Sequence, residues 1–576
     1  MILLFFLFGF TDEIGIFEIE ESKDLEIILQ DIEYLQQVPL DINTASVEQL
    51  SMIPYLSLSE CMKIVEYRKE SGGFDSVQDL LRIPGFDLFL LQKIKPYITI
   101  KMKIRKPGKF RSRLRFKSRL PGGDGAEEYY TKSEFYNGQY DVFLVTEKDP
   151  YESSFFDYYA AGILIDEGIR RFALGKYNLD LDPGVVLSPL GSFFNAMDFR
   201  LINQERGLIP YTSVLENNGF FGAALSDSFL VRFTAFYSNQ KLDGRIDSTG
   251  FARSFDETGD HTDSLSLSRK DRINEEIFGY DVRYRFSNLL LSNKSYLCRY
   301  TPPFVCADSF NDFYGDEFFI SGLEMKYIED FFVVFSEVAR SHRNQTGGIF
   351  GFIGYLPYVD FNLAGKYFPA GFYSPKGVEA REDYLGGVLD MAASPGFIKI
   401  GTTLTLDNDI DDDSVRYGIK LNIEKRNSLV RLKMQFRVRF RERVKDLSGS
   451  RVFLRITPNK FIFFDVRLEE KYVDTETGTE KGLLGALEMG VEYRRVKLRG
   501  RYGRFDTDSY DARIFAYEID LPGVINNRML YQKGDYGFVY MSVKPTDFLK
   551  FTLKYCVVTR DTVFSRQFGC QCDITW

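Results

Sequence analysis

Five basic residues occupy alternate positions in one short stretch, residues 110–120. They are Arg111, Arg113, Arg115, Lys117 and Arg119. Successive side chains of an extended strand point to opposite faces, so these five cations share one face. A wall of one sign attracts anions, and binding of an anionic solute, or of DNA, is therefore the first chemistry to consider. The preferred interpretation is the simpler one, that the cations form the polar face of a strand lining an interior.

The residues needed for common catalytic chemistry are missing from the sequence. It has no Gly-x-Ser-x-Gly motif, no phosphate-binding Gly-Lys-Ser/Thr loop and no His-Glu-x-x-His, and it has only two histidines. Acids alternate from Asp407 to Asp413, but the glycine and distal glutamate of a calcium loop are absent, which favours a solvated turn. We therefore expect no enzyme, no cofactor and no metal site.

The end of the sequence alternates strictly between apolar and polar residues. Phe568, Ile574 and Trp576 belong to its apolar set. This pattern resembles the C-terminal strand signature of bacterial outer-membrane β-barrels, with an apolar face toward lipid and a polar face toward the lumen. The resemblance implies two partners, the lipid of the outer membrane and the machinery that assembles barrels there.

Long alternating strands recur through most of the chain. The clearest runs from Val430 to Val444 and is longer than a typical soluble strand. Aromatic residues make up 16% of the chain, which fits the aromatic girdles at the two membrane interfaces of a barrel. The net charge of the chain is -9. These patterns predict a mainly β fold, a large transmembrane antiparallel barrel of about 22–26 strands, an even number being typical.

The chain divides into three parts. Residues 1–11 form a short apolar run that resembles the core of a signal peptide. Residues 12–100 have helical spacing of their apolar residues, and residues 101–576 are the predicted barrel. We expect a protein of the bacterial outer membrane with its helical domain in the periplasm.

The helical region contains a repeated motif. Residues 43–50, Ile53-Pro54, Gly73-Phe74 and residues 80–85 resemble the tandem helix-hairpin-helix domain of competence-type DNA receptors, over residues 41–100. The resemblance implies two small hairpins in one all-α domain. Their turns are the candidate contacts for a phosphate or a protein partner: Pro54, Tyr55, Leu56, Ser57, Pro84, Gly85, Phe86 and Asp87.

These turns do not favour DNA. DNA-binding hairpins carry Gly-hydrophobic-Gly, because glycine lets the backbone approach a phosphate. Here the first turn, Tyr55-Leu56-Ser57, has no glycine, and the second ends in Asp87, which repels phosphate. Acids also outnumber bases in this domain, whereas phosphate binding needs a basic footprint. A periplasmic protein partner is therefore preferred, and DNA remains the alternative.

A second resemblance extends over the barrel region. Leu174-Gly-Lys-Tyr177, Gly207–Ser213, Glu216–Ala224, Phe236–Ser238 and Glu337–Arg340 are similar to segments of uncharacterised outer-membrane proteins with an N-terminal helix-hairpin-helix domain, of the Bacteroidetes type. We therefore expect a non-enzymatic barrel that passes a solute or polymer, or that docks a periplasmic partner. The alternative is a DNA-binding component of a competence-like uptake system.

The interior of so wide a barrel must be either filled or open. The segment 183–218 mixes Gly, Pro, Phe and Leu without a strand period, and it is the first candidate plug. If the lumen is open, the arginines of residues 431–443 and the basic strand together make the electrostatic potential of the lumen positive. We then expect a preference for anions.

Overall fold

The structure is a computed structural model of the 576-residue chain. The residues that it describes are 35–36, 39–45, 49–50, 53, 56, 58–84, 86, 90–91, 94–100, 108–120, 127–150, 152, 157–181, 184–188, 207–228, 231–256, 261, 263–305, 313–329, 331–356, 359–369, 371–377, 384–393, 398–409, 414–427, 429–442, 444–476, 478–524, 526–561 and 563–576. The signal-like residues 1–11 lie outside this part of the chain.

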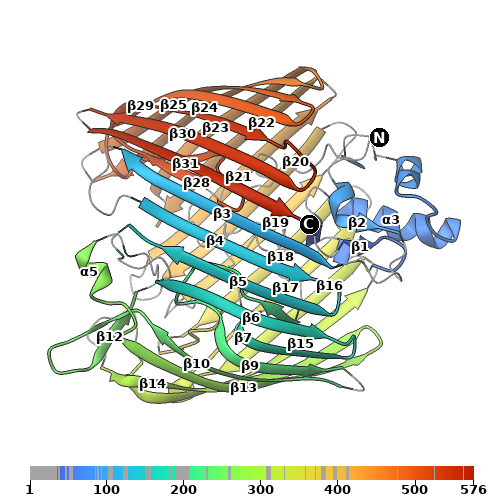
Figure 1. Ribbon diagram of the computed structural model, residues 1–576, viewed down its shortest axis with the longest axis vertical. Helices are drawn as coiled ribbons and strands as arrows, with labels where there is room; N and C mark the ends of the chain where they lie inside the picture. Colours follow the sequence, from blue (N-terminus) through green and yellow to red (C-terminus); the bar gives the residue numbers. More distant parts are fainter. Residues whose placement is uncertain are drawn as a thin grey trace.

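Within the described residues, 24 strands form a closed antiparallel barrel (Figure 1). This confirms the predicted fold class, and the strand number lies in the predicted range. The strands are β3 (Lys109–Leu120), β4 (Glu127–Tyr136), β5 (Tyr140–Lys148), β6 (Tyr158–Asp166), β7 (Arg170–Asp180), β9 (Phe220–Asp227), β10 (Arg232–Leu242), β13 (Ile273–Phe286), β14 (Leu289–Phe304), β15 (Gly315–Glu329), β16 (Phe332–Arg340), β17 (Thr346–Leu356), β18 (Val359–Phe368), β19 (Tyr384–Ala393), β20 (Ile398–Asp409), β21 (Ser414–Arg426), β22 (Val430–Arg441), β23 (Val444–Asn459), β24 (Ile462–Thr475), β25 (Gly478–Tyr493), β26 (Val496–Thr507), β29 (Lys533–Val543), β30 (Leu549–Arg560) and β31 (Val563–Thr575).

Smaller elements extend or fill this barrel. They are the strands β8 (Gly207–Pro210), β11 (Gly244–Ile246) and β12 (Ala252–Phe255), the separate hairpin of β27 (Ile514–Glu518) and β28 (Asn526–Leu530), the helix α5 (Ser264–Leu267) and the 3-10 turn His342–Asn344. None of the helices in the described part of the chain is long and apolar enough to cross a membrane.

The barrel closes where its first strand meets its last. β3 pairs with β31 from Arg111↔Thr575 to Leu120↔Arg566, and the backbone of Trp576 exchanges two hydrogen bonds of 2.7 Å with Phe110. Because lipid cannot satisfy a free strand edge, this seam is what makes the wall compatible with a bilayer.

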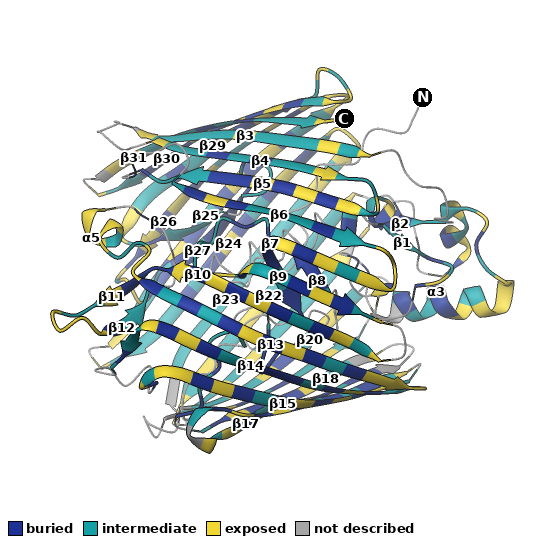
Figure 2. Cartoon of the chain, turned by 60° about the horizontal axis from the view of Figure 1, so that its bottom comes forward, coloured by how far each residue is buried: buried dark blue, intermediate teal, exposed yellow. Residues whose placement is uncertain are grey.

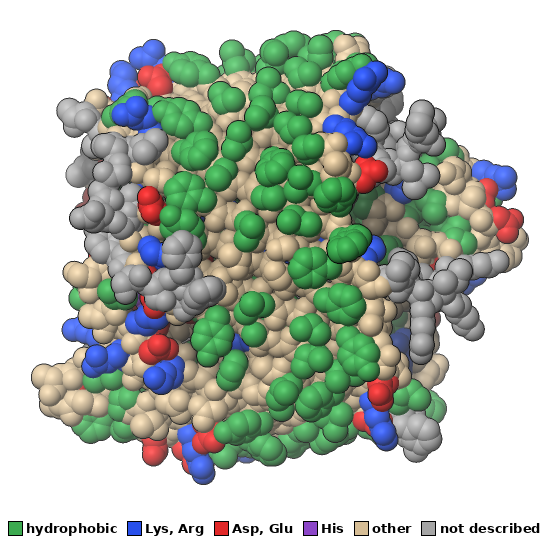
Figure 3. Space-filling view, viewed as in Figure 1, with side chains coloured by type: hydrophobic (Ala, Val, Ile, Leu, Met, Phe, Trp, Pro, Cys, Tyr) green, Lys and Arg blue, Asp and Glu red, His purple; other side chains and the backbone are tan. Residues whose placement is uncertain are grey.

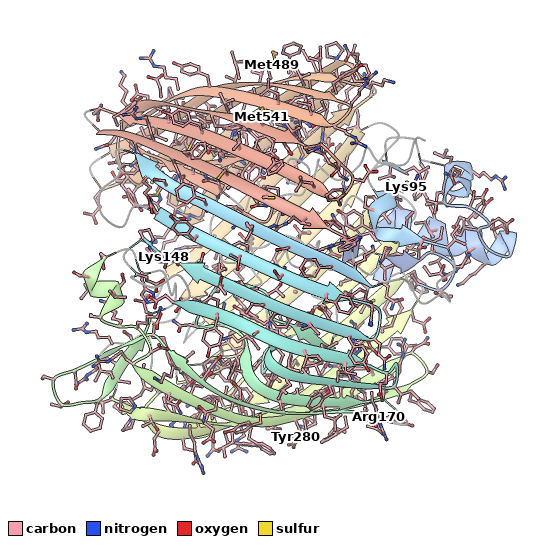
Figure 4. All side chains as sticks on the ribbon, in the orientation of Figure 1. Lys95, Lys148, Arg170, Tyr280, Met489 and Met541 are labelled. Atoms are coloured by element: carbon pink, nitrogen blue, oxygen red, sulfur yellow. The ribbon has the colours of Figure 1, made fainter. Side chains whose placement is uncertain are left out.

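The two ends of the barrel differ in their connections. The turns at the end that carries the helical domain are short, two to five residues long, such as 167–169 and 287–288. Every connection longer than six residues lies at the opposite end, and the longest include 243–272 and 508–532. Figure 4 places Arg170 at the short-turn end, near the domain that contains Lys95, and Lys148 at the long-loop end.

The outward face of the strands is apolar. Leu323 and Phe350 are 67% and 58% exposed, and Met489 and Met541 project outward in Figure 4. In Figure 3 such side chains gather between two rims that carry most of the charges. An apolar band between polar rims is the surface of a barrel that sits in lipid.

The buried side chains of the helical domain, among them Leu50 and Ile64, belong to one hydrophobic cluster with buried residues of the barrel. The domain comprises the helix α3 (Leu58–Ser71), the 3-10 turns Val77–Arg82 and Lys95–Tyr97, and the short parallel pair of β1 (Leu40–Asp41) with β2 (Ile98–Thr99). Asn43 joins the two repeats, because its side chain accepts from the backbone N–H of Phe74 (2.8 Å) and donates to the carbonyl oxygen of Phe74 (2.9 Å). α3 lies beside β17 and β18, which places the domain over one mouth of the barrel (Figure 1).

Removal of residues 568–576 tests the seam. The deletion takes away eight of the ten residues of β31 that pair with β3, so we expect the barrel to stay open and the protein to be lost from the outer-membrane fraction. Heat-modifiable mobility on gels, which the full chain should show, should disappear. Trp576→Phe keeps the backbone pair with Phe110 and should assemble normally. Recovery of folded full-length protein without detergent would contradict the barrel.

Candidate functional site

Part of the barrel interior is filled by the segment that follows β7. The backbone N–H groups of Gly184, Val185 and Val186 all donate to the carboxylate of Glu337 on β16, at 2.9, 3.0 and 3.2 Å. Lys294 on β14 donates to the carbonyl oxygen of Leu181 (3.2 Å) and lies 3.5 Å from Glu337. Glu337 and Lys294 are both fully buried, and a buried charge needs this full set of partners.

A second loop crosses the first inside the barrel. Ser374 donates its hydroxyl to the carbonyl oxygen of Val185 (2.6 Å), and Ser188 donates its backbone N–H to the carbonyl oxygen of Lys376 (2.7 Å). The ammonium of Lys376 lies 2.8 Å from Glu275 on β13. Residues 184–188 of the predicted plug thus lie against the inward side of the wall, and Thr212 and Ser213 bond the inward side chains Lys132 and Tyr158. Residues 207–210 instead extend the sheet of the wall, as β8 paired with β7, and residues 189–206 lie outside the described chain.

The β27–β28 hairpin also lies in the interior, and the sequence analysis did not predict it. β27 and β28 pair only with each other among the described residues. Apolar side chains of the hairpin, including Ile514 and Leu530, pack on Leu484 and Phe505 of the wall. Each strand has only five residues, so the pattern does not distinguish it from a short piece of wall.

Wall cations hold this hairpin largely through its backbone. Arg467 donates to the carbonyl oxygen of Phe515 (2.7 Å) and Lys471 to that of Asp511 (2.7 Å). The carboxylates of Glu518 and Asp520 lie 3.2 and 2.9 Å from the ammonium of Lys554 on β30. The hairpin therefore neutralises one side of the interior.

The predicted basic strand faces this hairpin. Phe110 and Leu114 are exposed on the outward face of β3, so the five cations point inward. Their partners are as follows: Arg113 bonds Asp573 (2.7 Å), Arg115 bonds Gln571 (2.8 Å) and the carbonyl oxygen of Pro522 (2.9 Å), Lys117 and Arg119 each lie 3.7 Å from Glu128, and Arg111 stands opposite Glu134 in the β3–β4 register. The first four cations of this strand are therefore half-buried and largely neutralised, while Arg119 is 60% exposed.

A second set of cations forms what we call the cationic wall, on the inward face of β20–β23. Its outward counterparts, such as Ile419 and Phe436, are exposed. The ten cations of the wall in the described chain are Lys399, Arg416, Lys420, Arg431, Lys433, Arg437, Arg439, Arg441, Arg451 and Arg455. The acids beside them are fewer: Asp407, Glu424, Asp446, and Asp465 and Glu469 from β24.

The cationic wall is open to water although it faces inward. On the filled side, inward residues such as Asp281 and Arg283 are 0% and 5% exposed. Along β22 the inward side chains Lys433 and Arg437 are half-buried, and Arg439 is 46% exposed (Figure 2 colours each strand by burial). The loops that join β20–β25 at the long-loop end have only two to four residues, so no in-folded loop starts from these strands.

One buried cluster has the residue types of a metal site. Ligand atoms of Glu152, Glu216 and His261 lie within 4.8 Å of one another. The ammonium of Lys270 lies 2.5 Å from Glu152 and 3.9 Å from Glu216. Although burial opposes it, hydrogen bonds to Asp243 and Glu152 raise the pKa of His261 to about 10. Lys270 and the protonated His261 thus join these loops as an ionic clasp.

The predicted hairpin turns are only partly described. Leu56 and Phe86 are buried in the core of the helical domain, and Pro84 accepts a hydrogen bond from Lys63 at its carbonyl oxygen (3.3 Å). Pro54, Tyr55, Ser57, Gly85 and Asp87 lie outside the described residues. The described residues of these turns, Leu56, Pro84 and Phe86, belong to the helical domain, whereas the basic strand lies in the barrel wall.

Comparison with known proteins supports the identity of the helical domain. Residues 35–99 match the helix-hairpin-helix motif family. ComE operon protein 1 of Bacillus subtilis is 36% identical over 62 residues, which are 11% of this chain and 30% of that protein. Endonuclease/exonuclease/phosphatase family domain-containing protein 1 of Mus musculus is 41% identical over 56 residues, 10% of each chain. The chain thus spans a third or less of these relatives.

Solved structures similar to this chain include an outer-membrane pore. The translocation pore of the P pilus usher PapC is 4% identical, with a TM-score of 0.38, over 81% of this chain and 99% of that one. The closed barrel with its apolar outer band and the motif at residues 35–99 describe the chain as an outer-membrane-type β-barrel with a helix-hairpin-helix motif.

Replacement of residues 509–531 with a short Gly-Ser linker tests the hairpin as a plug. We expect a larger single-channel conductance in planar bilayers, because the replacement removes an ordered hairpin from the interior. Shortening the exposed tip 247–251 of the β11–β12 loop is the matched control and should leave conductance unchanged. Equal conductance of the full chain and the hairpin replacement would show that the hairpin does not limit flow.

Proposed function

We propose that this barrel is a non-enzymatic passage for anionic solutes across the outer membrane, with the cationic wall as its selective surface. The observation that carries the proposal is the wall itself, ten cations beside five acids on a half-exposed inward face. Rings and walls of one charge select ions of the opposite sign, because they raise the local concentration of those ions. The passage runs along β20–β23, since in-folded segments occupy the other side.

The helical domain belongs in the periplasm in this proposal. Outer-membrane barrels have short periplasmic turns and longer extracellular loops. The helical domain lies at the end whose turns have two to five residues. The inference from turn length is independent of the signal-like N-terminus, and it supports the same orientation.

The helical domain serves as a docking module for a periplasmic protein. Its buried residues, such as Leu56 and Phe86, keep the hairpin architecture. Its net negative charge and the loss of turn glycines remove what a phosphate backbone needs. A domain that keeps its fold without its phosphate contacts is suited to binding a protein.

A DNA-uptake role is the second candidate. The observations in its favour are the match of residues 35–99 to the helix-hairpin-helix motif family and the similarity of 62 residues to ComE operon protein 1. In that case the helical domain would hold DNA at the mouth of a barrel with a cationic interior.

Ion selectivity tests the passage. Under a salt gradient in a planar bilayer, we expect a reversal potential that shows preference for anions. Lys420→Gln with Arg437→Gln removes two charges from the middle of the wall and should shift the reversal potential toward zero. Arg170→Gln with Arg299→Gln, which removes two exposed charges outside the wall, is the matched control. Cation preference of an open pore would overturn the proposal.

DNA binding by the helical domain separates the two candidates. We expect residues 24–100 to fold as a helical monomer and to bind duplex DNA no tighter than about 10⁻⁴ M at physiological salt, the weak end of non-specific binding. Fluorescence anisotropy against salt concentration measures this. Micromolar binding with a steep salt slope would instead favour DNA uptake.

A further inference from the structure

The pairing of β6 with β7 is the shortest between neighbouring strands of the barrel. Five residue pairs join these strands, from Gly162↔Gly175 to Asp166↔Arg171, and the next shortest pairing, of β9 with β10, has six. Beyond Gly175, β8 takes the place beside β7 that β6 would otherwise hold, because β8 pairs with residues 177–180 of β7. β6 lies beside β8, but no backbone ladder joins these two strands in the described part of the chain. We call this contact the β6–β8 seam, and separating its two strands breaks no ladder.

A row of three glycines crosses three strands where the seam begins. Gly162 of β6 pairs with Gly175 of β7, which pairs in turn with Gly222 of β9. Gly175 has a φ of 98°, a left-handed conformation that favours glycine, and a Cβ there would collide with the carbonyl oxygen of Ala161. Glycine inside a strand marks a bend or a close approach of two backbones. The row is therefore a hinge, at which β7 leaves the wall.

Behind the seam, the sheet of β7 and β8 lies inside the barrel. Leu174, just before the hinge, is 52% exposed, whereas Lys176 and Tyr177, just after it, are both buried. Leu208 and Ile209, consecutive residues of β8, are also both buried. Successive side chains of a strand point to opposite faces, so a strand with both faces buried has no side toward lipid. β6 therefore forms the outer side of the seam, and β8 forms its inner side.

The outer side of the seam belongs to the apolar band. β6 and β7 lie on the near face of the barrel in Figure 1. Tyr159 on β6, beside the seam, is 59% exposed. The part of β6 beyond its pairs with β7, residues 158–161, is ~13 Å long at ~3.3 Å per residue. An opening of that length admits one hydrocarbon chain more readily than the two chains of a phospholipid.

The interior behind the seam is apolar, whereas the interior of a membrane barrel is ordinarily polar. The buried members of one hydrophobic cluster there include Tyr177, Leu179, Leu208, Phe220 and Phe236. The ring of Phe220 stacks on that of Tyr177, with 5.6 Å between the centroids, and lies 5.5 Å from that of Phe236. A hydrocarbon chain that crosses the seam stays out of water on both sides, which is where it is most stable.

A cation lies just inside the seam. The ammonium of Lys176, the first residue of β7 beyond the hinge, donates to the side-chain oxygen of Gln240 (3.0 Å) and to the carbonyl oxygen of Glu216 (3.4 Å). Both of these acceptors are uncharged. A hydrogen bond from an ammonium to a carboxylate is stronger than one to a neutral oxygen. Lys176 can therefore bind the carboxylate of a ligand without giving up an ion pair.

We propose that the β6–β8 seam is a lateral portal, through which a long-chain carboxylate passes between the barrel interior and the lipid, with its carboxylate at Lys176. The portal opens when β8 and residues 176–180 of β7 move away from β6 about the glycine hinge. This goes beyond the proposed function, because the route is apolar and is separate from the cationic wall.

Photochemical labelling of the full chain in phosphatidylcholine liposomes tests the portal. The probe is palmitate with a diazirine near the end of its chain, and mass spectrometry locates the adducts. We expect adducts on the interior segments 177–181 and 207–211, as well as on outward residues such as Leu174. Ala161→Trp places a large ring beside the seam and should reduce labelling of the interior segments at least fivefold. Ala393→Trp, on β19 away from the seam, is the matched control and should leave that labelling unchanged.

Each outcome decides one part of the proposal. Labelling of the natural chain on outward residues alone would overturn the portal, and this result depends on no variant. Equal interior labelling of the natural chain and of a heat-modifiable Ala161→Trp variant would overturn the β6–β8 seam as the route.

Two further probes identify the ligand. Hexadecanol with the same diazirine should label the interior segments at least fivefold less than palmitate does, and equal labelling would overturn the carboxylate at Lys176. A phosphatidylcholine that carries the diazirine chain should label outward residues alone, and interior labelling equal to that of palmitate would overturn the single-chain ligand. The anion preference measured in planar bilayers tests the cationic wall separately, so failure of the portal and failure of the passage are distinguishable.

Discussion

Backbone hydrogen bonding in lipid is the constraint on which this structure depends. A strand edge in the bilayer has no water to pair with, so the sheet must close on itself. The seam between β3 and β31 satisfies this condition along ten residue pairs, and Trp576 completes it at Phe110. With 24 strands, closure creates an interior too wide for side chains alone to fill. In-folded loops fill one side of this interior, and the cationic wall lines the side that stays open to water.

The filled side shows how polar backbone is stabilised inside a barrel. Glu337 accepts three consecutive backbone N–H groups, and Lys294 bonds the carbonyl oxygen of Leu181. Each charge thus satisfies backbone groups that would otherwise be buried without partners. Replacing either residue would leave the other charge buried and incompletely paired, a change that usually costs several kcal/mol. The interior segments are therefore fixed parts of the barrel.

The sequence predicted the parts of the fold that depend on periodicity. Strand alternation gave the barrel and a correct range for its strand number, and the repeated helical motif indicated the helix-hairpin-helix domain. The sequence did not predict which distant residues hold a short element in place. β27 and β28 are five residues each, and their place inside the barrel depends on Arg467, Lys471 and Arg115, which are distant in the chain.

The motifs that stood out in the barrel sequence have a structural explanation. Glu337 anchors the segment after β7, and Lys176 donates to Gln240 (3.0 Å). Asn217 accepts from the backbone N–H of Asp243 at its side-chain oxygen (2.7 Å). These residues stood out in the sequence, but they hold interior loops in place. The cationic wall shares none of those motifs, and it becomes visible only when inward positions of four adjacent strands are compared.

The affinity of the cationic wall for a ligand must be limited if the ligand is to move along it. Passage requires sites favourable enough to be entered and weak enough to be left. Glu424 bonds Arg431 (2.8 Å) and Asp446 bonds Arg439 (2.9 Å). These acids therefore reduce the positive charge near both ends of β22. Half-buried cations also keep part of their hydration, which weakens each contact relative to a fully buried pair. Cations that are partly neutralised and partly hydrated therefore give several moderate sites in series, which suits movement along the wall better than one tight site would.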